Sequence, residues 1–335
     1  MRLLLLAAAL FATPLAAAPF TVQATGKGFE QLADAVNAIG DEDGTILIAP
    51  GTYRQCAVQS AGRITYRAAK PQAAIFDTTT CEGKAALVLR GRGATIDGLV
   101  FQKLFVPDGN GSGIRLERGP LEVGNSIFRD SEQGILSASD DPQATVRIDR
   151  STFSGLGRCD RGLSCAHSIY LGLIKSVTVT RSRFERGTGG HYVKSRAAHI
   201  DVSDCSFDDS RGHTTNYMID LPAGATGVIR RNVFVQGADK ENHSAFIAVA
   251  AESRTNSSKG LTVIDNKAHQ VEAATWPSAL VANWSADPII ITRNDVGVRV
   301  TTARKMAEQK PPSLSDKVRE KLRDYAVRAR QKIVG

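Results

Sequence analysis

A short segment that ends in phenylalanine recurs along the chain, and this repeat constrains the fold more than any other feature. The clearest copies end at Phe128, Phe153, Phe184, Phe207 and Phe234. Looser copies end at Phe101, Ala268 and Val296. Successive end positions lie 27, 25, 31, 23, 27, 34 and 28 residues apart. Such a period is typical of one turn of a solenoid, in which each repeat packs only on its neighbours.

Small, mostly hydrogen-bonding residues stand two positions before each end position. They are Ser126, Ser151, Ser182, Cys205, Asn232, Asn266 and Asn294. Stacked at one turn, such side chains satisfy buried backbone groups in coil after coil. Alternating β-branched segments precede them, as at 146–149, 177–180 and 200–203, and a second series lies upstream at 134–137, 168–171, 191–194 and 218–221. Each repeat therefore holds two or three short strands and no helix.

This pattern resembles the right-handed parallel β-helix of the pectate-lyase-like superfamily, and the resemblance covers roughly residues 20 to 300. An amphipathic helix is predicted over 29–39, followed by Gly44 to Tyr53, which is similar to the opening that caps such proteins. The resemblance implies an all-β fold with this N-terminal capping helix. At the far end, Ser315 is predicted to begin a helix with an apolar face that covers the last coil, with a tether to a polyanion or a surface as the alternative. The apolar face comprises Val318, Leu322, Tyr325, Ala329 and Ile333.

Three regions follow: a signal peptide at 1–18, the β-helix at 19–300 and a basic helical tail at 301–335. Residues 3–18 are apolar, follow Arg2 and end in three alanines, as secretory signals do. We therefore expect a periplasmic or secreted protein with no membrane span, and a monomer. The tail has ten Lys or Arg against four acids, which leaves the body nearly neutral and predicts no nucleic-acid partner.

The five cysteines fit an oxidising compartment. Cys159 and Cys165 bracket a short glycine-containing loop, Cys56 and Cys81 form a second plausible pair, and Cys205 is left as a buried thiol. Neither pair has the spacing of a zinc site.

The richest cluster of polar strand residues lies between 167 and 220. His167 and His191 are 24 residues apart, as are Tyr170 and Lys194, and Asp220 follows Lys194 after 26. Alternation predicts an outward patch on three neighbouring coils. The patch would comprise Tyr170, Tyr192, Lys194, Arg196, Met218 and Asp220, with both histidines at the strand entrances. A solvated sheet face is the alternative interpretation. The acids at 208–209 are predicted to lie in a solvated turn.

The resemblance implies an enzyme that cleaves an acidic, uronic-acid polysaccharide by β-elimination, since many members of the superfamily do so. Lys194 is then a base, if Arg196 lowers its pKa, and Arg196 holds the uronate carboxylate. Tyr170 or Tyr192 is the acid and His191 an alternative base, while Tyr192, Asp220 and His167 bind substrate. Calcium, which many related lyases use, is the one cofactor that the resemblance suggests.

Other functions stay open at this point. The chain lacks the Asp-Pro-His stretch of mannuronan C5-epimerases, with Asp141-Pro142-Gln143 as no substitute, and the aspartate motifs of polygalacturonase-like hydrolases. A β-helix hydrolase, a C5-epimerase and a non-catalytic carbohydrate-binding or envelope protein are the alternatives, because one scaffold hosts many functions.

Overall fold

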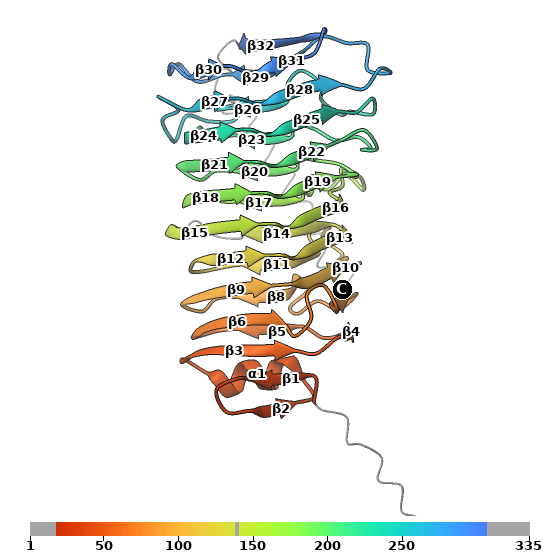
Figure 1. The fold of residues 1–335 in the computed structure, drawn as a ribbon, viewed down its shortest axis with the longest axis vertical. Coiled ribbons are helices and arrows are strands. Elements are labelled where there is room, and N and C mark those ends of the chain that lie inside the picture. The colour runs from red at the N-terminus through yellow and green to blue at the C-terminus, as the bar shows by residue number, and fades with distance from the viewer. Residues whose placement is uncertain (1–17, 138–140, 307–335) are drawn as a thin grey trace, which may run out of the picture.

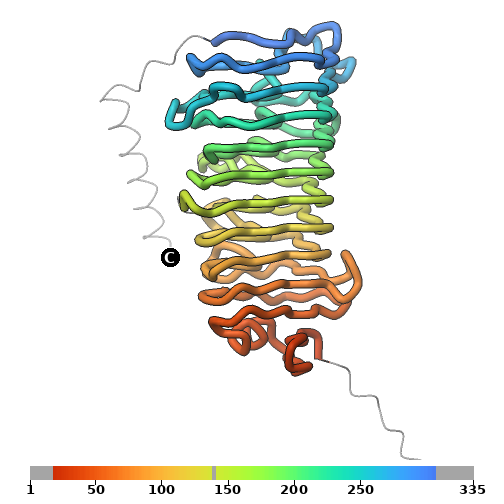
Figure 2. The backbone as a smooth tube through the Cα atoms, turned by 60° about the vertical axis from the view of Figure 1, so that its left-hand side comes forward, coloured from red at the N-terminus to blue at the C-terminus, as the bar shows by residue number. Residues whose placement is uncertain are grey.

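The computed structural model describes residues 18–137 and 141–306, and the signal peptide and the predicted C-terminal helix lie outside these ranges. Strands stack coil on coil into a column, from the N-terminal end at the base of Figure 1 to the C-terminal strands at its top. The coils follow one another without interruption (Figure 2). None of the helices in the described ranges is long and apolar enough to cross a membrane.

Three parallel sheets run the length of the column, and each coil contributes one strand to each sheet. The first sheet has twelve strands, in the order β2 (Lys27–Phe29), β1 (Phe20–Val22), β3 (Asp43–Ile48), β6 (Arg63–Ala68), β9 (Gly93–Asp97), β12 (Leu121–Gly124), β15 (Asp141–Asp149), β18 (Ile174–Thr180), β21 (His199–Ser203), β24 (Thr226–Arg230), β27 (Thr262–Ile264) and β30 (Ile290–Thr292). At the N-terminal edge of this sheet, β1 pairs antiparallel with β2 and with β3, and the other described strand pairs are parallel.

The second and third sheets have ten strands each. The second sheet contains β4 (Gly51–Tyr53), β7 (Ala74–Asp77), β10 (Leu99–Gln102), β13 (Ile127–Ser131), β16 (Thr152–Leu156), β19 (Arg183–Glu185), β22 (Ser206–Asp208), β25 (Val233–Gln236), β28 (Lys267–Gln270) and β31 (Asp295–Val296). The third contains β5 (Ala57–Gln59), β8 (Ala85–Leu89), β11 (Ser112–Leu116), β14 (Gln133–Ser137), β17 (Ile169–Leu171), β20 (Val193–Ser195), β23 (Ile219–Leu221), β26 (Ile247–Val249), β29 (Ser278–Asn283) and β32 (Val300–Lys305). The predicted parallel β-helix is confirmed.

The phenylalanine repeat forms the core of the column. Phe128, Phe153 and Phe184 are direct partners across the second sheet, and their rings stack with centroids 4.8 and 4.9 Å apart. The stack continues through Phe207 to Phe234. Each ring is almost wholly buried, so it contributes both apolar burial and ring contacts to stability. The repeat is thus the packing unit of the fold.

The predicted hydrogen-bonding column is also confirmed. The backbone N–H of Ser126 donates to Ser151 Oγ at 3.3 Å, and Ser151 N–H donates to Ser182 Oγ at 3.1 Å. Further along, the N–H of Cys205 donates to Asn232 Oδ1 at 2.9 Å. The residue just before this column has positive φ in each coil, for example 48° at Arg181, because the chain turns there from the first sheet into the second. Buried turns are thereby satisfied from one coil to the next.

The N-terminal helix is shorter than predicted. Helix α1 spans Leu32–Ile39 and buries Leu32, Ala35, Val36 and Ile39. Phe29, expected in the helix, instead pairs with Phe20 in the β1–β2 hairpin. The hairpin and the helix together cover the first coil, which would otherwise expose unpaired strand edges. At the other end, β32 continues the third sheet to Lys305, beyond the boundary expected at residue 300.

Candidate active site on the third sheet

Tyr170, Lys194 and Asp220 form a ladder on the outer face of the third sheet. Tyr170 is the direct partner of Lys194 across β17 and β20, and Lys194 is the partner of Asp220 across β20 and β23. The flanking side chains point into the core and are fully buried, as at Ile169, Val193 and Ile219. The repeat spacing therefore predicted this register correctly.

Tyr192 is a correction. It precedes β20, so strand alternation does not apply to it, and its ring enters the core 6.3 Å from Phe184 in an edge-to-face contact. It is 1% exposed, and its hydroxyl donates to Asp209 Oδ1 at 2.7 Å. Its predicted outward orientation is wrong, and so is that of Met218, which is also 1% exposed and likewise precedes its strand.

Asp209 is a second correction, because it is fully buried rather than solvated. The Lys240 ammonium lies 3.0 Å from its carboxylate, and the Thr215 hydroxyl donates to it at 2.8 Å. Buried charges need such partners. Tyr192, Asp209 and Lys240 therefore form a structural network beneath the site.

Lys194 is the centre of the charged groups on the face. Its Nζ lies 3.3 Å from Asp220 Oδ2 and 2.6 Å from Glu252 Oε1. Although burial opposes charge on the ammonium, Asp220 and Glu252 outweigh it and raise the pKa of Lys194. The expectation that Arg196 lowers this pKa is wrong. The Lys194 ammonium therefore stays protonated at neutral pH.

Arg196 completes a clamp around Glu252. Its guanidinium pairs with one carboxylate oxygen of Glu252 while Lys194 holds the other. Its Nε also donates to the Tyr170 hydroxyl at 3.2 Å. Burial opposes ionisation of Glu252, yet hydrogen bonds from both cations lower its pKa. Lys194 and Arg196 thus hold one carboxylate between them.

His167 and His191 stack at the strand entrances, with ring centroids 4.9 Å apart. The backbone N–H of His191 donates to His167 Nδ1 at 3.0 Å, and His191 Nε2 lies 3.4 Å from Asp220 Oδ2. Burial, aided by Lys194 and Arg196, lowers the pKa of His167 to about 3. Burial, His167 and Lys194 also hold the pKa of His191 well below its usual range. Both imidazoles are therefore neutral at pH 7.

Asp220 lies beside Lys194 on the neighbouring strand and is 3% exposed. Burial raises its pKa to about 6, against the opposing effect of Lys194. Its Oδ2 contacts both Lys194 and His191, so Asp220 can orient both groups.

Gly189 and Gly190 let a neighbouring loop approach the histidines. A Cβ at Gly190 would lie 2.1 Å from the Ala166 carbonyl oxygen and 2.6 Å from His167 Nδ1. A Cβ at Gly189 would clash with the backbone of Arg158 and Cys159. Both glycines also have positive φ, at 140° and 62°. The Gly-Gly pair before His191 is thus a packing requirement.

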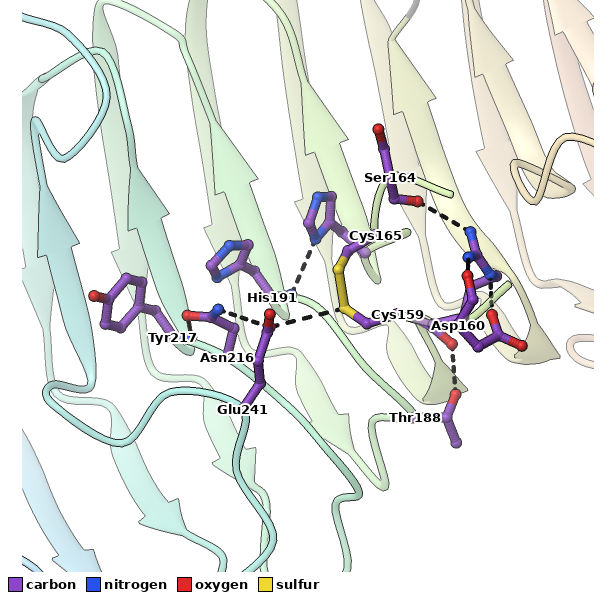
Figure 3. The surroundings of a disulfide bond; sticks show 12 residues. Cys159, Asp160, Ser164, Cys165, Thr188, His191, Asn216, Tyr217 and Glu241 are labelled. Atoms are coloured by element: carbon purple, nitrogen blue, oxygen red, sulfur yellow. Dashed lines mark hydrogen bonds and ion pairs between the residues drawn. A yellow bond between two sulfur atoms is a disulfide. The ribbon is translucent and has the colours of Figure 1, made fainter. Parts of the chain in front are cut away.

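That loop is closed by the predicted Cys159–Cys165 disulfide (Figure 3). The predicted Cys56–Cys81 disulfide is also present, and Cys205 is buried with its thiol pKa raised by burial to about 12. The Cys159–Cys165 loop forms one wall of a cavity of about 350 Å³, which is also lined by His167, Tyr170, His191 and Lys194. Three of the candidate catalytic groups, Tyr170, His191 and Lys194, therefore share one cavity, and Arg196 lies outside its lining.

The acids at the site do not fit a calcium ion. Asp220 and Glu252 both contact the Lys194 ammonium, which occupies the position that a metal ion would need between them. Within the described ranges, the one close group of possible metal ligands is Cys159, Cys165 and Glu241, and its two sulfurs are joined to each other.

Glu252 is the residue that sequence reasoning missed. It lies in the loop between β26 and β27, 58 positions beyond Lys194, and no repeat spacing connects the two. One signal was present. The two longest intervals in the phenylalanine series, 34 and 31 residues, contain the Glu252 loop and the disulfide loop respectively. Long intervals in a solenoid indicate insertions, and these two flank the site.

No protein-family model matches this chain, and no curated protein sequence matches it. Several solved structures resemble it, among them two alginate lyases and a phage tailspike. The PL6 family alginate lyase AlyGC is 14% identical over 79% of this chain and 38% of its own, with a TM-score of 0.45. An alginate lyase from Paenibacillus sp. strain FPU-7 is 16% identical over 83% and 96%, with a TM-score of 0.46. The tailspike gp49 of Acinetobacter baumannii bacteriophage Fri1, a capsular polysaccharide depolymerase, is 11% identical over 86% and 61%, with a TM-score of 0.44. This chain spans about two fifths of the length of AlyGC. Its function has to be argued from its own residues.

Proposed function

We propose that this protein is a polysaccharide lyase that cleaves an acidic, uronic-acid polysaccharide by β-elimination. One observation carries the proposal: Lys194 and Arg196 hold the two oxygens of one carboxylate, that of Glu252. A uronate carboxylate has the same charge and shape. Substrate would bind by displacing Glu252 and taking its place between the two cations.

The chemistry needs this pair of charges. β-Elimination removes the proton on C5, next to the carboxylate, and the negative charge then spreads onto the carboxylate oxygens. Lys194 and Arg196 stabilise that charge where it develops. The C5 proton leaves to a base, the C4–C5 double bond forms, and the C4–O4 bond breaks as O4 takes a proton.

His191 is the proposed base and Tyr170 the proposed acid. His191 is neutral, because burial and nearby cations depress its pKa, and it lines the cavity. The Tyr170 hydroxyl accepts a hydrogen bond from Arg196 Nε, so its own proton is free to be donated to O4. Asp220 and His167 are almost wholly buried, and we assign them to positioning His191 and Lys194.

Glycoside hydrolysis is a second candidate, favoured by one observation. Asp220 has its pKa raised to about 6, whereas that of Glu252 is lowered. Two carboxyl groups with pKa values pushed apart are the acid and base that hydrolases use. In that mechanism Glu252 is essential, whereas the lyase mechanism needs it displaced.

The test uses the mature protein and a panel of acidic polysaccharides. We expect a rise in the absorbance of unsaturated uronyl ends, lost in Lys194→Ala and Arg196→Ala and kept in Arg231→Ala, which removes an exposed arginine elsewhere. New reducing ends without that absorbance would establish hydrolysis. Binding that yields no product and that survives Lys194→Ala would establish a carbohydrate-binding protein.

We also propose a periplasmic or secreted location, which the two disulfides support.

A further inference from the structure

A second cavity, larger than the one at the candidate site, lies on the other side of the disulfide loop. Its volume is about 730 Å³. We call it the arginine groove, because Arg158, Arg161, Arg186 and Arg211 line it. Cys159 belongs to its wall, whereas Cys165 belongs to the wall of the site cavity. The two cavities are therefore neighbours that share one loop. Figure 3 shows this loop, with Asp160 and His191 on opposite sides of the disulfide.

The groove is elongated along the column. Its lining residues lie at or just after the ends of five successive strands of the second sheet: Phe105 follows β10, Ser131 ends β13, Arg161 follows β16, Arg186 follows β19 and Arg211 follows β22. Neighbouring strands are about 4.8 Å apart, so five coils span roughly 19 Å. A groove of this length suits a linear polymer better than a compact ligand.

Its exposed groups suit an acidic sugar chain. Arg161 and Arg186 are 46% and 40% exposed, and each faces acidic partners that leave several of its five N–H donors open. Arg211 is exposed and helps to lower the pKa of Asp208. Glu132, the acid that pairs with Arg161, is 2% exposed and accepts backbone hydrogen bonds from Val106 and Gly111. Asp130 and Asp160 also line the groove and are 48% and 63% exposed. The groove therefore presents three exposed guanidinium groups, of Arg161, Arg186 and Arg211, beside two exposed carboxylates.

Phe105 adds an apolar surface at one end. Its side chain is 61% exposed, and it is the one aromatic residue among the exposed large hydrophobic residues of the described ranges. Its ring face fits the C–H face of a pyranose, while the guanidinium groups fit carboxylate or sulfate groups in a bidentate manner. A single exposed aromatic residue is common on protein surfaces. Phe105, however, lies in a groove with three exposed arginines, and an acidic glycan likewise carries both apolar ring faces and charged groups.

We infer that the arginine groove is a distal binding site for an acidic polysaccharide, which holds sugar residues away from the bond that reacts. This inference rests on the proposed function for its substrate class. The groove raises the affinity for long chains and leaves the chemistry at Lys194 unchanged. Short oligosaccharides, which cannot reach across the disulfide loop, gain nothing from it.

The test compares Arg186→Ala/Arg211→Ala and Phe105→Ala with a matched double variant, Arg231→Ala/Arg293→Ala, which removes two exposed arginines from another edge of the column. Each is made in the full chain with Lys194→Ala, so that the polymer is not consumed. Affinity for alginate, polygalacturonate and their disaccharides is measured by calorimetry. We expect the Arg186/Arg211 variant to bind its polymer about tenfold more weakly, and the disaccharide within twofold of the control.

The outcomes separate the two proposals. If the groove variants and the control bound the polymer with equal affinity, the groove proposal would be wrong, even if wild-type protein yields unsaturated product. Loss of polymer affinity in the groove variants supports the groove, even if no product forms. If neither polymer binds the protein, the groove proposal is wrong.

Discussion

Glu252→Gln should tighten the binding of acidic substrate, because Glu252 occupies the place that the proposed mechanism gives to the substrate carboxylate. Its two oxygens contact Lys194 and Arg196 in the free protein. Substrate must break both contacts before it can make its own. The amide of glutamine has nearly the same shape but no charge, so it competes less well for the two cations.

The size of the effect follows from the exposure of the Glu252 side chain, which is 44%. Charge-assisted hydrogen bonds contribute about 1.5–3 kcal/mol each when buried. Exposed ion pairs contribute only about 0.2–1 kcal/mol, and a half-exposed glutamate lies nearer that range. Two contacts then amount to about 1–2 kcal/mol, which corresponds to roughly 5- to 30-fold in Kd. Glu252→Gln should lie at the lower end of this range and Glu252→Ala at the upper end.

The assay is the Kd of an acidic oligosaccharide by calorimetry, together with KM and kcat on the polymer. Glu272→Gln, which neutralises an exposed acid far from the cavity, is the control. We expect a lower Kd and KM with kcat retained. Unchanged or weaker binding would refute the reasoning about displacement. Retained binding with abolished turnover would instead favour hydrolysis, in which Glu252 acts directly.

Three further predictions concern stability and the loop. Asn232→Ala removes the acceptor for the Cys205 N–H and the donor to the Val202 carbonyl, so the free energy of unfolding measured in urea should fall by about 2–4 kcal/mol. The loss should exceed that of Asn294→Ala, which lies at the half-buried end of the column. Equal losses in the two variants would contradict the role of burial. Cys159→Ser with Cys165→Ser should abolish turnover while the unfolding midpoint shifts little, because the bond closes a short loop; retained turnover would show that the loop does not shape the cavity. Burial raises the pKa of Asp220 in the folded protein to about 6, above the ordinary value of 3.8. The folded state then binds more protons than the unfolded chain, so Asp220 makes the free energy of unfolding fall as pH rises from about 4 to 6. Asp220→Asn should remove that fall of about 2–3 kcal/mol in the free energy of unfolding, measured in urea across this pH range. If the free energy of unfolding of wild-type protein and of the variant depended on pH in the same way, the raised pKa of Asp220 would be refuted.

Much of the fold was predictable because the solenoid repeats its own packing. The phenylalanine positions set the register of the second sheet, and the Ser, Cys and Asn column set the turns. The spacing of Tyr170, Lys194 and Asp220 gave the ladder of the site for the same reason. Phe29 was misassigned because its helical periodicity competed with strand pairing to Phe20, which the sequence alone does not reveal.

The parts that failed lie where the repeat is interrupted. Tyr192 stands one residue before its strand, so alternation assigned it to the wrong face. Glu252 reaches Lys194 from an inserted loop, and loops follow no period. Asp220 and then Glu252 raise the pKa of Lys194. The sequence placed Asp220 beside Lys194, but the predicted direction considered only Arg196 and was therefore wrong.

The most direct test of the central claim is the chemical structure of the new chain end. Wild-type protein, Lys194→Ala and Arg231→Ala are incubated with alginate and polygalacturonate, and the non-reducing ends of the products are identified by NMR spectroscopy. The account predicts a C4–C5 double bond at the new end for wild-type protein and Arg231→Ala, and no product for Lys194→Ala. A saturated non-reducing end, or an unsaturated one that Lys194→Ala still produces, would contradict it.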